Sequence, residues 1–149
     1  PNIQQKQIYT FVLKAFLNTF FAKKVKNGYK LDKIARKILN EKKDDGFLFN
    51  HALGHGVGLN VHEMPPSISK SKFSKRKLKE NMVFTIEPGL YREKCFGVRL
   101  ENTVYTIKKG NKLKLKTFVN FPFEEKCIDF NILSKDEKKL FRKYKRMSK

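Results

Sequence analysis

The chain has 149 residues, of which 40% are hydrophobic and fourteen are phenylalanine, which predicts a single folded domain and excludes a disordered chain. No apolar run is long enough to cross a bilayer, so we expect no membrane partner. The net charge is +20, from 34 Lys and Arg residues against 14 Asp and Glu residues. Because most of this charge is lysine scattered along every segment, we interpret it as a solvated surface and do not expect nucleic acid as a partner.

The first third of the chain predicts two helices. Apolar residues recur at helical spacing between Ile3 and Ala22, and residues 26–28 form a turn. A second helix follows, with the apolar residues of 31–39 on one face, and it ends by the turn signal Asp45-Gly46. The two segments therefore indicate an αα pair.

The remainder has the character of strands followed by one helix. Residues 108–111 are typical of a hairpin turn, and Ser134 with Glu137 forms a capping box that opens a last charged helix. The order of elements predicts an α+β fold with a mostly antiparallel sheet. Branched and aromatic residues mark three β-like stretches, which are 82–87, 96–105 and 113–119.

All three histidines of the chain lie in one segment, HALGHGVGLNVHEMPP, which begins at His51. His51 and His55 are four apart, as in a helical metal-binding motif, but each of the glycines between them and His62 weakens a helix by roughly 1 kcal/mol. We therefore interpret the segment as extended backbone with tight bends, which can direct several side chains into one cleft. The bends leave the relative direction of His55 and His62 open.

Two glutamates are candidates to complete a metal site. Glu87 ends a strand-like stretch in TIEPG, and Glu101 lies in GVRLEN. Carboxylates complement an imidazole for manganese, cobalt or zinc, and a carboxylate in an apolar strand requires a compensating partner. If the two glutamates are considered without the histidines, the preferred interpretation is that Glu101 pairs with a lysine or faces water.

Three motifs in the same order resemble the creatinase-type, or pita-bread, metallopeptidases of the M24 type. They are GHGVGLNVHEMP, FTIEPGLY and GVRLEN, and the arginine two positions before the last glutamate resembles the Xaa-Pro aminopeptidase (aminopeptidase P) and prolidase branch. The tail FVNFPFEEKCIDFNILSKDEKKLF also resembles the end of aminopeptidases P, where an apolar strand leads into a last helix. The resemblance implies the second half of a pita-bread fold, with two N-terminal helices on a mostly antiparallel curved sheet and a C-terminal helix.

The resemblance also implies roles for individual residues. His55 would bind one of two divalent ions, Glu87 would bind the other and act as general base, and Glu101 would bridge them. His62 would hydrogen-bond the substrate and help to stabilise the tetrahedral intermediate. His51 and Arg99 would line the substrate site. Hard-ligand chemistry favours manganese, with cobalt or zinc as alternatives.

The family's site also needs two aspartates, one in a D-x-G strand and one about eleven residues later. The five aspartates of this chain do not reproduce that pattern. We therefore expect residues 1–149 to be the C-terminal part of a catalytic domain whose N-terminal half carries those ligands and is a partner of this segment. Alone, the segment is expected to bind no metal ion or one, to have little activity, and to self-associate as a homo-oligomer through its uncovered apolar face.

The leading hypothesis is an Xaa-Pro aminopeptidase that releases the N-terminal residue from peptides with proline in second position. One alternative is an Xaa-Pro dipeptidase (prolidase), and another is a catalytically silent pita-bread binding module. The intact set of His55, Glu87 and Glu101 argues against the silent module, which only the basic charge favours. Cys95 and Cys127 match no metal or redox spacing, which indicates reduced thiols and a cytoplasmic protein.

Overall fold

We analysed a computed structural model, which describes residues 1–147. The α-helices are α1 (Ile3–Phe20), α2 (Gly28–Leu39) and α3 (Lys135–Met147). The strands are β1 (Gly54–Gly56), β2 (Glu63–Ile68), β3 (Val83–Ile86), β4 (Gly89–Tyr91), β5 (Gly97–Arg99), β6 (Asn102–Lys109) and β7 (Lys112–Thr117). Short 3-10 helices span Asn40–Lys42, Lys72–Lys75 and Glu125–Cys127.

The α1 and α2 helices begin at side-chain caps that the sequence supplies. Asn2 caps α1, where its side chain accepts a hydrogen bond from the backbone of Gln5, and Asn27 caps α2. The predicted second helix is shorter than expected, because α2 ends at Leu39 and a 3-10 turn follows. Residues 40–46 contain no apolar side chain that could continue the buried face of α2, which explains the early end.

The predicted capping box before α3 is confirmed. The amide of Ser134 donates to Oε2 of Glu137 at 2.9 Å, and the amide of Glu137 donates to Oγ of Ser134 at 3.2 Å. The apolar strand that the tail's resemblance implied is absent from the described residues, because 118–124 adopt no strand. Residues 118–124 include Pro122, which cannot donate to a ladder.

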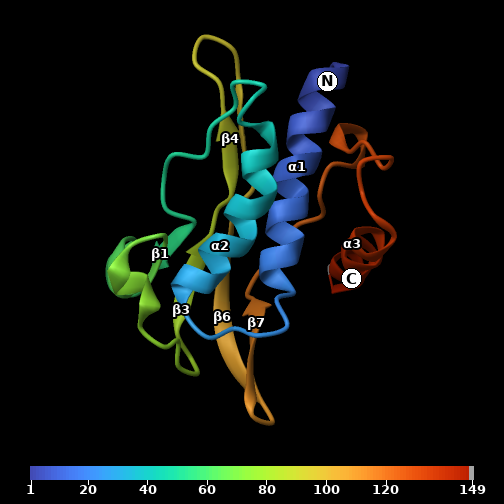
Figure 1. The fold of residues 1–149 in the computed structure, drawn as a ribbon. Helices are drawn as coiled ribbons and strands as arrows, with labels where there is room; N and C mark the ends of the chain where they lie inside the picture. The colour runs from blue at the N-terminus through green and yellow to red at the C-terminus, as the bar shows by residue number, and fades with distance from the viewer. Residues whose placement is uncertain (148–149) are drawn as a thin grey trace.

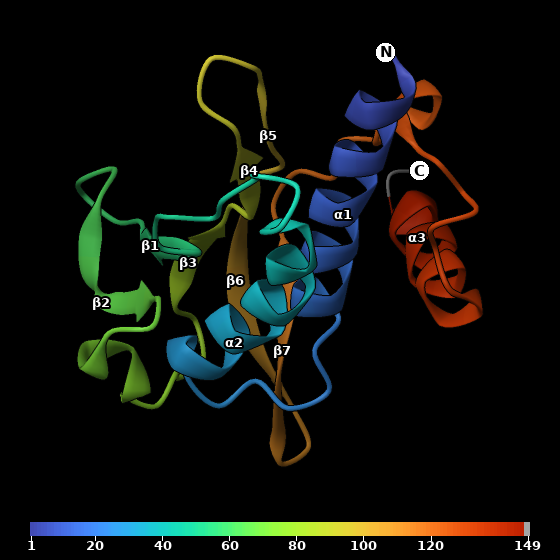
Figure 2. The same cartoon turned by 45° about the horizontal axis from the view of Figure 1, so that its top comes forward.

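The strands form a five-stranded antiparallel sheet in the order β2-β1-β3-β6-β7 and a separate β4-β5 ribbon. α1 and α2 lie side by side over one face of the sheet, and α3 lies beside α1 (Figure 1). A second view shows the β1–β2 hairpin on the opposite side of the molecule from α3 (Figure 2). This arrangement confirms the α+β fold with two helices on a mostly antiparallel sheet and a C-terminal helix. The predicted hairpin turn is also confirmed, because Lys109 pairs with Lys112.

The core lies between the sheet and the helices. Phe84 and Ile86 of β3 and Val104 of β6 are fully buried on the helix side. They pack in one cluster with the buried side chains of α1 and α2, which include Val12, Leu13, Phe16, Leu17, Leu31 and Ala35. Because strand side chains alternate, Thr85 and Glu87 project from the opposite face of the same strand.

The β3–β6 ladder and the β4–β5 ribbon have the same pairing register. Ile86 lies opposite Asn102 in the β3–β6 ladder, and Gly89 lies opposite Arg99 in the β4–β5 ribbon. Continuing either ladder places the backbone of Glu87 opposite that of Glu101. The predicted β-like stretch over 96–105 is therefore divided between β5 and β6, since the pairing breaks beside Pro88, which has no N–H to donate.

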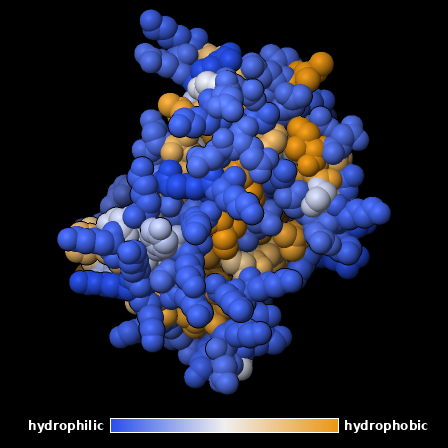
Figure 3. Space-filling view, viewed as in Figure 1, coloured by the Kyte–Doolittle hydropathy of each residue, from blue (hydrophilic) through white to orange (hydrophobic). Residues whose placement is uncertain are grey.

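Hydrophilic residues cover most of the face seen in Figure 1, as expected for this charge (Figure 3). Within residues 1–147, no helix combines the length and the hydropathy that a bilayer span requires. Three strands were not predicted, namely β1, β2 and β4. β2 contains Pro65 and Pro66, which an edge strand tolerates because one side of its ladder is unpaired.

Candidate functional site

His55 and Glu87 meet between β1 and the end of β3. Nε2 of His55 lies 3.4 Å from Oε1 of Glu87, and the Glu87 residue is only 9% exposed. Thr85 holds both residues, because its hydroxyl accepts a hydrogen bond from the His55 amide at 3.1 Å and donates to Oε1 of Glu87 at 3.0 Å. The strands approach closely here, since a Cβ at Gly54 would lie 1.9 Å from the carbonyl oxygen of Thr85. The predicted extended conformation around His55 is confirmed.

The imidazole of His55 has a defined tautomer. Its Nδ1 lies 2.9 Å from the carbonyl oxygen of Gly56, which can only accept, so Nδ1 carries the proton. When the ring is neutral, Nε2 presents a lone pair to a carboxylate oxygen of Glu87. Two acceptors facing each other need a cation or a proton between them, and this backbone contact at Nδ1 is typical of metal-binding histidines.

His62 lies over the His55 ring. The two ring centroids are 4.0 Å apart, and the planes are inclined by 36°. His62 is exposed, whereas His55 is half-buried, so His62 lies on the solvent side of the pair. The relative direction that the sequence left open is thereby decided: both imidazoles lie at the same site.

His51 and Arg99 are joined through Tyr91, which the sequence analysis did not single out. Nε of Arg99 donates to the hydroxyl of Tyr91 at 2.7 Å, and that hydroxyl lies 3.0 Å from Nε2 of His51. Nδ1 of His51 lies 2.7 Å from the carbonyl oxygen of Ala52 and therefore donates to it, so Nε2 accepts the Tyr91 proton. Arg99 also approaches Glu87, with Nη1 3.6 Å from Oε2.

A sequence signal for Tyr91 exists in the strand alternation. Tyr91 and Glu87 are separated by an even number of positions, so they share one face of the ribbon. Gly97 lies opposite Tyr91 and leaves room for its ring, because a Cβ at position 97 would lie 2.4 Å from Cδ1 of Tyr91. The even spacing from Glu87 is the only part of this signal that the sequence carries, since the pairing with Gly97 comes from the strand register.

Burial and hydrogen bonding set the protonation of this network. Burial lowers the pKa of His51, and the nearby positive charge of Arg99 acts in the same direction. Both effects keep the His51 imidazole neutral, which agrees with its role as the acceptor for Tyr91. The hydrogen bond to Tyr91 raises the pKa of Arg99, so the guanidinium stays charged.

Glu101 is the more exposed of the two candidate carboxylates. Its backbone faces that of Glu87, but its side chain is exposed, and it lines a hollow of about 320 Å³ with residues of the 121–124 segment. Within residues 1–147, no group of three or more His, Cys, Asp or Glu side chains is arranged to hold a metal ion. The role of Glu101 as a ligand stays a prediction.

Comparison with protein families gives the same class as the geometry. The model of metallopeptidase family M24 matches residues 1–108. The chain belongs to family M24. The pita-bread resemblance stated from the motifs is therefore confirmed.

The relatives of this M24 chain include both Xaa-Pro aminopeptidases and Xaa-Pro dipeptidases. An Xaa-Pro dipeptidase of Pyrococcus horikoshii is 47% identical over 78% of the chain and 32% of its own length. A probable Xaa-Pro aminopeptidase P of Arthroderma gypseum is 36% identical over 97% of the chain and 24% of its own length. The chain thus spans about a quarter to a third of the relatives it matches.

A solved M24 structure reproduces the whole fold. The crystal structure of X-prolyl aminopeptidase from Caenorhabditis elegans, described as a cytosolic enzyme with a di-nuclear active site, superposes with a TM-score of 0.85. It is 31% identical, and the alignment covers 99% of this chain and 25% of that one.

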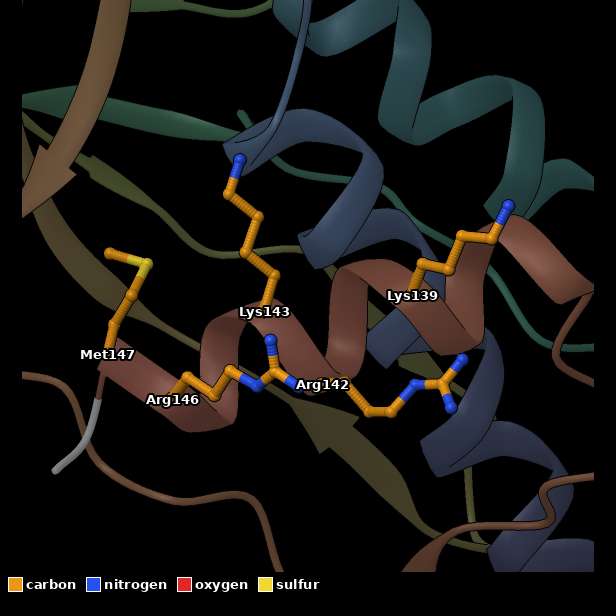
Figure 4. Close-up of a pocket in the computed structure, with 5 residues that line it drawn as sticks. All are labelled: Lys139, Arg142, Lys143, Arg146 and Met147. Carbon is orange, nitrogen blue, oxygen red and sulfur yellow. The ribbon is translucent and has the colours of Figure 1, made fainter.

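A basic hollow of about 540 Å³ lies on α3, on the side of the molecule away from β1 and β3. Figure 4 shows the side chains that line it extending from the helix. They are Lys139, Arg142, Lys143, Arg146 and Met147. The ammonium group of Lys143 lies over the ring of Phe21, 4.7 Å from its centroid. No acidic side chain is among the residues that line this hollow.

Proposed function

We propose that this chain is part of an Xaa-Pro aminopeptidase, which releases the N-terminal residue from peptides with proline in second position. The observation that carries the proposal is the pair formed by Nε2 of His55 and Oε1 of Glu87, with Nδ1 of His55 committed to a backbone carbonyl. An imidazole nitrogen and a carboxylate oxygen at one site supply the two donor types that suit divalent transition metals. Membership of M24 supports the same chemistry.

The residues fit part of a dinuclear site. We assign His55 to one ion, Glu87 to the other, and Glu101 to a bridge between them, with manganese as the first candidate metal. Two bound divalent ions supply polarisation of the scissile carbonyl and activation of the attacking water. Glu87 is also assigned as the general base, since its carboxylate is buried and oriented by the hydroxyl of Thr85.

The remaining polar residues are assigned to the substrate. His62 is exposed beside His55, so it can donate a hydrogen bond to the peptide carbonyl as charge develops on it. His51 and Arg99 flank Tyr91 and would orient the peptide chain. Arg99 also neutralises Glu87 in part.

We further propose that residues 1–149 form the C-terminal part of the catalytic domain, and that the remaining metal ligands come from outside this segment. The proposal is supported by the share of the relatives that the chain spans and by the incomplete ligand set within residues 1–147. A cytosolic location is proposed from the description of the Caenorhabditis elegans relative and from the free thiols of Cys95 and Cys127.

The test is peptide hydrolysis by the full-length protein with and without divalent metal. We expect release of the first residue from an Xaa-Pro tripeptide, loss of activity with a chelator, and recovery with Mn²⁺. His55→Ala should weaken metal binding in a calorimetric titration, whereas Glu93→Gln, an exposed carboxylate on the β4–β5 loop, should not. Absence of Xaa-Pro hydrolysis with every metal tested would contradict the proposal.

Two alternatives have distinct outcomes in the same experiments. Cleavage of Xaa-Pro dipeptides but not tripeptides would favour prolidase activity, which relatives such as the Pyrococcus horikoshii enzyme support. Tight, steeply salt-dependent binding to random DNA without hydrolysis would favour a silent binding module, for which the net charge of +20 is the supporting feature.

A further inference from the structure

One buried ion pair on α2 holds the segment that carries His51. Arg36 projects from the last turn of α2 and donates from Nη1 to the carbonyl oxygen of Phe49 at 2.9 Å and from Nη2 to the carbonyl oxygen of His51 at 2.6 Å. Its third nitrogen, Nε, donates to Oδ2 of Asp32 at 2.7 Å. A planar guanidinium is suited to this arrangement because its donors form a rigid fork.

The same guanidinium also fixes the ring of His51 indirectly. Cζ of Arg36 lies 4.4 Å from the centroid of the Phe49 ring, and that ring meets the His51 ring edge-on at 4.7 Å. His51 is thus held at its backbone by Arg36, along its ring by Phe49, and at Nε2 by Tyr91. Loops are usually mobile, so such a set of contacts limits the motion of this one.

The carboxylate of Asp32 is buried beside the backbone of Leu53, and this burial requires an explanation. The side chain of Asp32 is 2% exposed, and that of Arg36 is 16% exposed. Burial raises the pKa of Asp32, whereas the hydrogen bond and charge of Arg36 lower it. A buried carboxylate is unfavourable unless it is paired, so Asp32 depends on its ion pair with Arg36.

We propose that Asp32 and Arg36 are positioning residues for His51: Asp32 orients the guanidinium, and the guanidinium holds the 49–51 backbone so that His51 faces the active site. The inference rests on the proposed function, in which His51 contacts the substrate. It adds two residues of α2 to those that serve the substrate site.

The first test is hydrogen–deuterium exchange by mass spectrometry on the full-length protein, which needs no activity. Arg36→Met should increase exchange in peptides covering residues 47–53, where the amide of Leu48 bonds to Tyr91. Arg36→Lys should do the same, because an ammonium keeps the charge but cannot donate to both carbonyls and to Asp32 in this geometry. Lys37→Met is the control, since Lys37 is exposed on the same helix turn.

The second test is a double-mutant cycle on kcat/KM with an Xaa-Pro substrate. We expect Arg36→Met to lower kcat/KM about 10–100-fold, the range found when a residue that orients a functional group is removed. In the presence of His51→Gln, Arg36→Met should lower it no more than about twofold, because the oriented imidazole is already absent. Asp32→Asn should have a smaller effect in the same direction, since its amide oxygen can still accept from Arg36.

The two tests separate the inference from the function on which it rests. Unchanged exchange over 47–53 in Arg36→Met would overturn the positioning role, whatever the activity. Effects of Arg36→Met and His51→Gln that multiply in the double variant would also overturn it, because they would mark Arg36 as a general stabiliser. If His51→Gln leaves kcat/KM unchanged, the proposed role of His51 is wrong, and the exchange result alone then decides whether Arg36 holds the segment.

Discussion

The two faces of the β3–β6 ladder differ in what covers them and in what they carry. Phe84, Ile86 and Val104 lie under α1 and α2 and are fully buried. Thr85 and Glu87 alternate with them along β3 and face away from the helices, next to His55. Strand alternation thus assigns the apolar side chains of this stretch to stability and the polar ones to the candidate site, within the four consecutive positions 84–87.

Glu87→Gln should have the largest effect on the chemical face. We expect kcat/KM of the full-length protein on an Xaa-Pro peptide to fall about 10²–10⁴-fold, because the amide cannot accept the proton that a general base accepts. Its free energy of unfolding should change less than that of a core variant. Activity equal to that of the Glu93→Gln control would contradict the role of Glu87.

Phe84→Ala, on the face of the sheet under the helices, should mainly lower stability. Removing a fully buried phenylalanine should lower the free energy of unfolding by about 3–5 kcal/mol, measured by urea titration. Tyr105→Ala is the matched control on the other face of the sheet, where the side chain is half-buried, and should have a smaller effect. An equal loss of unfolding free energy in both variants would show that the helix face does not contribute more to stability than the other face.

Gly97→Ala should displace Tyr91 and with it the hydrogen bonds that join His51 to Arg99. A Cβ 2.4 Å from Cδ1 of Tyr91 forces the ring to move, which should lower the free energy of unfolding by about 1–3 kcal/mol and lower kcat/KM. Tyr91→Phe separates the causes, since it removes the hydroxyl that joins His51 to Arg99 but keeps the ring. Wild-type kinetics in both variants would exclude a role for this network.

Residues 1–149 should self-associate when prepared alone, through the open face of the sheet. Phe118 is 62% exposed and stacks on Tyr105, whose side chain projects from that face. Phe118→Ser should therefore reduce association at high concentration in sedimentation velocity, whereas Ile3→Ser, 77% exposed at the start of α1, should not. If the unmodified segment is monomeric at high concentration, the prediction of self-association through this face is wrong.

The smallest expected effect is the pH dependence contributed by His51. Its pKa is lowered below 6.5 in the folded protein, mainly by burial, so the unfolded chain binds a proton there more readily. Stability from this group is complete above about pH 6.5 and falls as the pH drops toward and through the folded pKa. The difference in unfolding free energy between the unmodified protein and His51→Gln should therefore change with pH only below that value. A difference that is constant from pH 7 to 5 would contradict the shift.

The sequence alone determined the local structure and the class of site. Helical spacing predicted α1 and α2, the Ser134 box predicted the start of α3, and the glycines predicted extended backbone around His55. The motifs indicated family M24, because a motif consists of residue types at fixed spacings, which can be read directly from the sequence. Short strands such as β1 and β4 escaped prediction, since three residues carry too little periodicity to distinguish a strand from a loop.

Only the tertiary structure decided which side chains meet. The link from Arg99 through Tyr91 to His51, and the contact of Arg36 with the carbonyls of Phe49 and His51, join elements that are separate in the sequence. Such contacts depend on strand register and on the docking of α2 against the 47–53 segment, and neither leaves a period or a motif in the sequence. The position of Glu101 has the same origin, since the strand register places the backbone of this exposed residue opposite that of the buried Glu87.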